Sequence, residues 1–219
     1  LLLGSLGGAI PALAAQAGID WTLHPAAVNH SWTSVTYGNG RFVAVATAGS
    51  DSVMTSPDGS TWTSRTSAAD NQWYGVTYGN GLFVAVASTG NGNRVMTSPD
   101  GSTWTSQTSA ADLGWRSVTY GNGLFVAVAN SGNGNRVMTS PDGSTWTSQT
   151  SAANLGWRSV TYGNGLFVAV ADTGSGNRGQ TSPDGSNWTS QTSAADNEWY
   201  GVTYGNGLFV AVASSGSGN

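Results

Sequence analysis

Cysteine is absent from this chain of 219 residues, and charged side chains make up only 8% of it. Without cysteine there is no disulfide framework and no thiolate metal site, and two histidines, His24 and His30, are too few for a histidine-rich site. Lysine is also absent, and the net charge is −4. An acidic chain without a basic cluster is a poor partner for nucleic acid or an anionic membrane surface. We therefore expect no metal, no other cofactor and no nucleic-acid partner.

One phrase recurs five times and is the most informative feature that is present. It reads Val-Thr-Tyr-Gly-Asn-Gly-(Leu/Arg)-Phe-Val-Ala-Val-Ala and begins at Val35, Val76, Val118, Val160 and Val202, so successive copies are 41, 42, 42 and 42 residues apart. A fixed period of about 40–45 residues made of short strands is typical of a β-propeller. The sequence therefore predicts an all-β fold, a β-propeller of about five four-stranded antiparallel blades. The repeats start near residues 32, 73, 115, 157 and 199, and the last blade is incomplete.

The unit that starts at Trp115 shows why each repeat predicts four strands. Ser117–Tyr120 and Leu124–Ala129 are rich in β-branched, aromatic and aliphatic residues, and the Asn-Gly pair between them favours a two-residue hairpin turn. The second of these segments is apolar on both faces, as expected of a strand that lies between two neighbouring blades. A third strand begins near Arg136 and a fourth near Thr145, with a tight Ser-Pro-Asp-Gly turn between them.

That last turn belongs to a longer motif. Ser56–Trp62 reads Ser-Pro-Asp-Gly-Ser-Thr-Trp, and the motif recurs, once with asparagine in the threonine position, at 98–104, 140–146 and 182–188. It resembles the Asp box, and the chain is similar to the Asp-box (BNR-repeat) propellers of the sialidase-like superfamily fold. The family contains enzymes and non-enzymatic secreted proteins. A non-enzymatic member is expected, because no Arg-Ile-Pro motif is present and Glu198 is the only glutamate. We therefore expect no enzyme activity and no catalytic residue.

The motif residues are expected to be structural, because a side chain that recurs in every unit serves the unit. In a turn, a Ser or Asp side chain accepts hydrogen bonds from backbone N–H groups, Gly takes a positive φ, and Trp buries a large area. The expected structural positions are Ser56, Asp58, Gly59, Trp62, Ser98, Asp100, Gly101, Trp104, Ser140, Asp142, Gly143, Trp146, Ser182, Asp184, Gly185 and Trp188.

Between the units that start at Trp73 and Trp115, the differences lie in or beside two loops, one from the fourth strand to the next first strand and one from the second strand to the third. In an up-and-down blade both loops lie on one face of the disc, where loops on a rigid scaffold often carry binding residues. Neutral drift at exposed positions is the alternative explanation. The candidate ligand contacts are Tyr74, Arg116, Arg158 and Tyr200, directly after the repeated Trp, and Asp70, Asp112, Asp196 and Glu198, just before it.

These features favour a secreted or cell-surface binding propeller whose ligand is a glycan or a protein. Tyr and Arg side chains suit ring stacking and charge-assisted hydrogen bonds. Two alternatives stay open. One is a part of a sialidase-like glycoside hydrolase whose carboxylate pair, or Tyr nucleophile, is missing from this sequence. The other is a purely structural repeat domain of a surface or adhesion protein.

The N-terminal residues differ from the repeats. Residues 1–17 are apolar and end in small residues, which is similar to a secretory signal peptide, and residues 18–219 form the predicted propeller. The apolar stretch is too short for a transmembrane helix with its flanks, so we expect no membrane insertion.

Two expectations concern the closure of the ring. Asp20–Leu23 resembles a fourth strand, because Trp21 lies 11 residues before Trp32, as Trp104 lies 11 residues before Trp115. It is expected to close the ring, since closure removes exposed strand edges. We also expect the natural reading frame to continue with a third strand for the last blade. This chain alone is expected to form an open arc or a poorly sealed ring.

Overall fold

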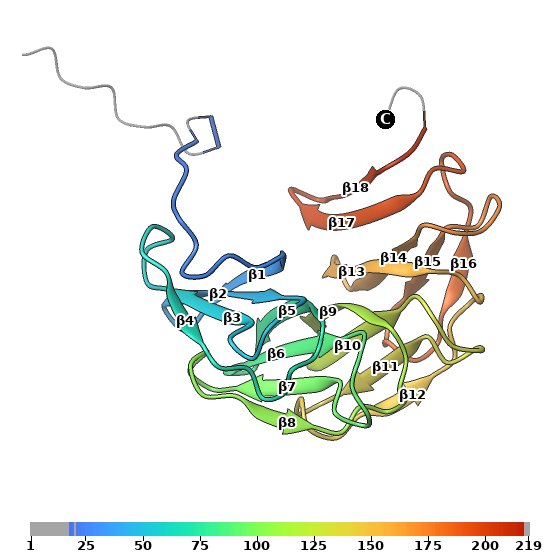
Figure 1. Ribbon diagram of the computed structural model, residues 1–219. Coiled ribbons are helices and arrows are strands. Elements are labelled where there is room, and N and C mark those ends of the chain that lie inside the picture. The colour runs from blue at the N-terminus through green and yellow to red at the C-terminus, as the bar shows by residue number, and fades with distance from the viewer. Residues whose placement is uncertain (1–17, 20, 217–219) are drawn as a thin grey trace, which may run out of the picture.

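The computed structural model describes residues 18, 19 and 21–216, and this part of the chain folds into antiparallel sheets without any helix (Figure 1). Four sheets contain four strands each and a fifth contains two. Within each sheet the strands follow one another in sequence order. The predicted all-β fold of repeated four-stranded antiparallel blades is therefore confirmed.

Each position in the blade is filled by equivalent segments of the repeats, and we number the blades 1 to 5 in sequence order. The first strands are β1 (Trp32–Gly38), β5 (Trp73–Gly79), β9 (Trp115–Gly121), β13 (Trp157–Gly163) and β17 (Trp199–Gly205). The second strands are β2 (Arg41–Ala46), β6 (Leu82–Ala87), β10 (Leu124–Ala129), β14 (Leu166–Ala171) and β18 (Leu208–Ala213). The third strands are β3 (Val53–Ser56), β7 (Val95–Ser98), β11 (Val137–Ser140) and β15 (Gly179–Ser182). The fourth strands are β4 (Thr63–Arg65), β8 (Thr105–Gln107), β12 (Thr147–Gln149) and β16 (Thr189–Gln191).

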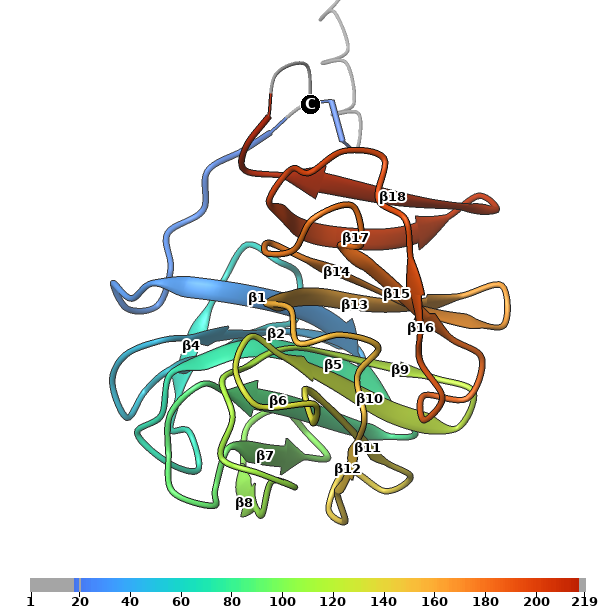
Figure 2. The same ribbon diagram turned by 90° about the vertical axis from the view of Figure 1, so that its right-hand side faces the viewer.

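The first strands of the five blades lie side by side around a central axis (Figures 1 and 2). β5 contacts β1 and β9, and β13 contacts β9 and β17. The fourth strands lie at the periphery (Figure 1). A side chain near the start of a first strand therefore comes close to its counterparts in other blades, although they are 41 or 42 residues away in the sequence.

The hairpin that joins the first two strands of a blade depends on its Asn-Gly pair. In blade 3 Asn122 has a φ of 49° and Gly123 a φ of 77°. Positive φ at both central residues is the requirement of a type I′ turn, whose twist matches that of the flanking strands. The same pair of positive φ angles recurs in all five blades.

Each turn between the third and fourth strands is closed by side-chain hydrogen bonds. In blade 3 Gly143 N donates to Ser140 Oγ at 2.8 Å. The Asp142 carboxylate accepts from Ser144 N at 2.8 Å and from Thr145 N at 2.7 Å. Equivalent bonds occur in blades 1, 2 and 4. These contacts define the turn, whereas the assignment to the Asp-box family stays a prediction.

The turn contacts act on the pKa of the four aspartates. Hydrogen bonds from the backbone N–H groups of Thr145 and Ser144 lower the pKa of Asp142 from 3.8 to about 2. Backbone donors likewise hold the pKa of Asp58, Asp100 and Asp184 below the ordinary range. Donors that favour the charged form stabilise the carboxylate in the folded state.

Asp142→Ala is expected to lower the free energy of unfolding at pH 7 by about 0.5–2 kcal/mol, the cost of losing a side-chain cap. The folded-state pKa is depressed, so this stabilisation is present above the unfolded pKa near 4 and is lost as pH falls toward about 2. Urea titrations of both proteins between pH 7 and pH 2 measure the difference. Asp142→Asn keeps one acceptor oxygen, so its free energy of unfolding should lie between that of the parent chain and that of Asp142→Ala. A difference that stays constant down to pH 2 contradicts the role of the charge.

The second strands are buried on both faces because an inner blade packs against two neighbours. Val126 and Val128 of β10 lie in one cluster with Trp157 and Phe167 of blade 4. Phe125 of the same strand lies in a cluster with residues of blade 2. Successive residues therefore face opposite blades, which explains why both sets are apolar.

Blades 1 and 5 each lack one such neighbour, and the five blades form an open arc (Figure 1). Leu208, Val210 and Val212 of β18 are exposed, as are Val35 and Tyr37 of β1. Their counterparts in the inner blades are buried or half-buried. The open arc thus leaves two apolar sheet faces in contact with solvent.

The predicted closing strand at Asp20–Leu23 is wrong. Residues 21–26 have no regular secondary structure, and Trp21 and Leu23 are 88% and 95% exposed. A strand needs an edge with which to pair, and the structure describes no third strand of blade 5 that this segment can join. Asp20 itself and the signal-peptide-like residues 1–17 lie outside the described residues. Over the described part of the chain, no helix has the length and apolar character needed to cross a bilayer.

Candidate binding site at the axial mouth

Two kinds of loop meet on one face of the propeller. Gly92, in the loop after β6, donates its N–H at 2.8 Å to the carboxylate of Asp112, in the segment that leads into β9. On the other face, the side chain of Asn39 in a hairpin turn donates at 3.1 Å to Pro99 O of the neighbouring blade's turn. The segments that vary between units therefore share one face, which we call the loop face.

Side chains from all five blades converge on the axis at the loop face. The residue directly after the repeated Trp is the second residue of each first strand, and together these residues line a hollow of about 240 Å³. We call this hollow the axial mouth. Its lining residues are Thr33, Tyr74, Arg116, Arg158 and Tyr200. The structure thus brings together the four residues that the sequence singled out after the Trp and adds Thr33, their counterpart in blade 1.

The arginines and tyrosines of the axial mouth are stacked in pairs. The guanidinium carbon of Arg116 lies 3.9 Å from the ring centroid of Tyr74, and that of Arg158 lies 5.0 Å from the ring centroid of Tyr200. Both distances are within the range of a cation–π contact. Each pair joins neighbouring blades, so the orientation of one side chain depends on the next blade.

Each arginine is also held by a residue at the start of the loop after the second strand. Arg158 forms an ion pair with Asp172, with Nε 2.6 Å from Oδ2. The Asp172 side chain is only 11% exposed. In blade 3 the equivalent residue is Asn130, whose amide oxygen accepts from Arg116 Nη2 at 3.1 Å and Nε at 3.2 Å when its amide nitrogen donates to Gly114 O. The hydrogen-bond network selects this amide orientation.

The residue before the repeated Trp and the residue at the start of the loop after the second strand vary together from unit to unit. In blades 3 and 4 a glycine precedes the Trp, because a Cβ at Gly114 or Gly156 would come within 2.3 or 2.2 Å of the Asn130 or Asp172 side chain. In blades 2 and 5 the corresponding residues are Gln72 and Glu198, which accept hydrogen bonds at 3.1 Å from the hydroxyls of Ser88 and Ser214. Independent drift does not by itself explain such coupling, because the residues that change together contact one another. Asn130 and Asp172 therefore support the site, although neither is among the contacts predicted from the sequence.

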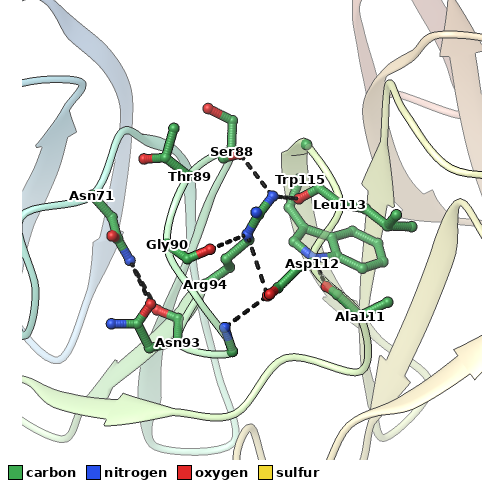
Figure 3. A network of polar contacts seen from close by, with 12 residues as sticks. Asn71, Ser88, Thr89, Gly90, Asn93, Arg94, Ala111, Asp112, Leu113 and Trp115 are labelled. Atoms are coloured by element: carbon green, nitrogen blue, oxygen red, sulfur yellow. Dashed lines mark hydrogen bonds and ion pairs between the residues drawn. The ribbon is translucent and has the colours of Figure 1, made fainter.

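The acidic candidates lie elsewhere. Asp112 accepts from Gly92 N and lies 3.4 Å from Arg94 Nε, so its carboxylate joins two loops (Figure 3). Asp196 accepts from Gly176 N in the same way, and Glu198 accepts from Ser214. Asp70 is exposed and does not line the axial mouth. The four carboxylates thus do not converge with the Tyr and Arg residues.

Arg94 belongs to this loop network and not to the axial mouth. Its guanidinium donates to three backbone carbonyls, at 2.9 Å to Gly90, 2.8 Å to Ser88 and 2.8 Å to Leu113 (Figure 3). Burial lowers the pKa of its counterpart Arg136. Among the residues that the structure describes, no three His, Asp or Glu side chains are grouped closely enough to hold a metal ion.

Solved structures with the same fold are numerous, although no family model and no curated protein matches the sequence. YCF48 bound to D1 peptide matches with a TM-score of 0.62 and 18% identity over 84% of this chain and 60% of that one. An inactive variant of virginiamycin B lyase from Staphylococcus aureus, with quinupristin, matches with a TM-score of 0.72 and 16% identity over 83% and 63%. Nidogen in a nidogen/laminin complex matches with a TM-score of 0.60 and 13% identity over 84% and 72%.

The prediction that the chain is not an enzyme is contradicted by these comparisons. The matching lyases, at 13–16% identity, show that this fold carries catalysis in other proteins. The expectation is based on the absence of glycosidase motifs, which concerns one reaction class and not enzymes in general. The chain spans about 60% of the length of the first structures that it matches. At such low identity these comparisons show the fold alone, and that fold is a β-propeller.

Proposed function

We propose that this propeller is a binding scaffold that holds a polypeptide segment of a partner protein at the axial mouth. The observation that carries the proposal is the convergence of two Arg and two Tyr side chains, from four blades, on one hollow. Arg and Tyr are enriched among the residues that dominate binding energy in protein interfaces. Among proteins of this fold, YCF48 binds a D1 peptide and nidogen binds laminin, which supports the proposal.

A polypeptide ligand fits the axial mouth better than the glycan that the sequence also suggested. Sugar stacking uses an open face of an aromatic ring, and a guanidinium covers one face of Tyr74 and of Tyr200, which leaves at most one face of each ring for a sugar. A hollow of about 240 Å³ has room for a few side chains. Binding outside the cell and membership of the Asp-box family are parts of the same proposal, based on residues 1–17 and on the repeated Ser-Pro-Asp-Gly turns.

The proposal is tested with peptides selected from a random 12-residue phage library against the whole chain. Tyr74→Ala combined with Arg116→Ala should weaken the selected peptides at least about tenfold, the effect of losing about 1.4 kcal/mol of contact energy. Circular dichroism and thermal melting verify that the variant is folded. Calorimetric titration measures the affinities.

The matched control removes positive charge away from the axial mouth. Arg65→Ala removes one arginine that does not line the mouth, the same loss of charge as in the test variant, and it should leave the affinity within about twofold. Failure to select any peptide, or selected peptides that bind the Tyr74→Ala/Arg116→Ala variant as well as the parent chain, would refute the proposal.

A further inference from the structure

The two arginines of the axial mouth occupy equivalent positions but differ in charge balance. Arg158 is paired with the carboxylate of Asp172 at 2.6 Å. Arg116 is held by Asn130, a neutral amide. An ion pair with a nearly buried carboxylate compensates the guanidinium charge, whereas an amide orients the guanidinium and leaves its charge in place. The two supporting residues differ only in that Asn130 carries an amide where Asp172 carries a carboxylate, since Asn and Asp side chains have the same shape.

Arg116 also has unused hydrogen-bond donors. A guanidinium carries five N–H groups, and Asn130 Oδ1 accepts from Nε and from Nη2. Among the described residues, no acidic side chain pairs with Arg116, in contrast to Arg94, Arg158 and Arg178. The Nη1 side of a planar, charged group therefore remains available at the axial mouth.

The ring of Tyr74 keeps this guanidinium in position. Stacking at 3.9 Å, together with the two contacts of Asn130, fixes the plane of Arg116 before any ligand arrives. A pre-oriented guanidinium loses less entropy on binding and matches a planar carboxylate with two parallel hydrogen bonds. At the equivalent position of the next blade, Nε and Nη2 of Arg158 both approach Oδ2 of Asp172, so a guanidinium–carboxylate pair is already present at this position within the chain.

We infer that Arg116 is the anchor for a carboxylate of the ligand, so that the axial mouth selects acidic polypeptide segments. The inference rests on the proposed function for the nature of the ligand, but the carboxylate contact is testable separately. Asn130 is a positioning residue in this scheme, because it acts through Arg116. The carboxylate comes from an Asp or Glu side chain or from a chain terminus.

The test exchanges the partners of the two arginines. Asn130→Asp gives Arg116 the acidic partner that Arg158 has, and Asp172→Asn gives Arg158 the neutral partner that Arg116 has. Each variant copies a residue present at that position in another blade, so both are expected to fold. Asn91→Asp, on an exposed residue of the loop after β6, adds the same charge away from the axial mouth and is the matched control.

The first probes are hexapeptides with blocked ends, one containing two Glu and the other two Gln. The parent chain should bind the Glu peptide about tenfold more tightly at low salt. Asn130→Asp should abolish this preference, Asp172→Asn should increase it severalfold, and Asn91→Asp should change it by less than twofold. Equal binding of the Glu and Gln peptides, or a preference that Asn130→Asp leaves intact, overturns the inference while the proposed function stands.

The second arm observes the carboxylate contact without a peptide. In a titration of the ¹⁵N-labelled chain with acetate, the Nε–H signal of Arg116 should shift and saturate in the parent chain but not in Asn130→Asp. If the signal responds to acetate in this way but none of the peptides binds, the inference is supported and the proposed function is refuted. A signal that does not respond to acetate overturns the inference.

Two further probes identify the source and type of the anion. A Gln hexapeptide with a free C-terminus that binds as tightly as the blocked Glu peptide assigns the carboxylate to a chain terminus, and weaker binding assigns it to a side chain. Either result supports the inference that a carboxylate of the ligand contacts Arg116. Inorganic phosphate is added to the complex with the Glu peptide in parallel with acetate. If phosphate displaces the peptide at concentrations at which acetate has no effect, the inference that Arg116 binds a carboxylate is overturned in favour of a phosphate ligand.

Discussion

Gly121→Ala is expected to destabilise the protein by about 3 kcal/mol or more, although it adds a single methyl group. Gly121 ends β9, and a Cβ placed on it would come within 2.1 Å of the Tyr162 ring in the next blade. The ring cannot withdraw easily, because it packs against the core cluster around Trp157 and Phe167. The φ of Gly121 is not positive, so the expected loss is steric and not a backbone effect. Urea unfolding followed by tryptophan fluorescence measures it.

The repeat supplies a matched control for this substitution. Gly205 occupies the same position in blade 5, and nothing lies within 4 Å of a Cβ built on it. Gly205→Ala should leave the free energy of unfolding unchanged or raise it by up to about 1 kcal/mol, since alanine reduces the entropy of the unfolded chain. Equal losses for the two variants would mean that the glycine serves its own blade and that the contact with the neighbouring Tyr is unimportant.

Phe125→Ala is expected to cost about 3–5 kcal/mol, the range for truncating a fully buried phenylalanine. Phe125 is 0% exposed. It contacts Tyr120 of its own blade, with ring centroids 4.7 Å apart, and packs against Val84 and Val86 of blade 2. Denaturant titration at constant pH gives the free-energy difference.

Phe209→Ala is the corresponding control in blade 5. Phe209 keeps the contact within its own blade, with its ring centroid 4.8 Å from that of Tyr204. It is only partly buried, because β18 has no third strand beside it in the described part of the chain. The expected loss is about 1–2 kcal/mol. A loss as large as that of Phe125→Ala would show that contacts within a blade, and not coverage by further strands, carry the stability.

Only some residues of the candidate site can be predicted from the sequence. Tyr74 and Arg116 could be selected from the sequence, because positions that differ between otherwise identical units stand out. Asp112 could be selected in the same way, but it joins two loops, since the partner Gly92 N is 20 residues away and comes close only in the folded chain. Asn130 differs between units as well, and it lies beside Arg116 across the β9–β10 pair, where the register shifts between Val128 and Ala129; that local geometry, and with it the contact, is seen only in the structure.

The sequence by itself determined the period, the strands and the turns of this protein. Those features depend on neighbours along the chain: runs of β-branched, aromatic and aliphatic residues make the strands, and Asn122 and Gly123 take the positive φ that the hairpin needs. The tertiary structure alone decided which copy of a repeated residue is buried, which is exposed and which faces the axis. Gly121 and Gly205 are the same residue in the same local sequence, but only Gly121 is covered by the next blade. Burial and convergence on an axis are properties of contacts between blades, so identical repeats acquire different roles only when the chain has folded.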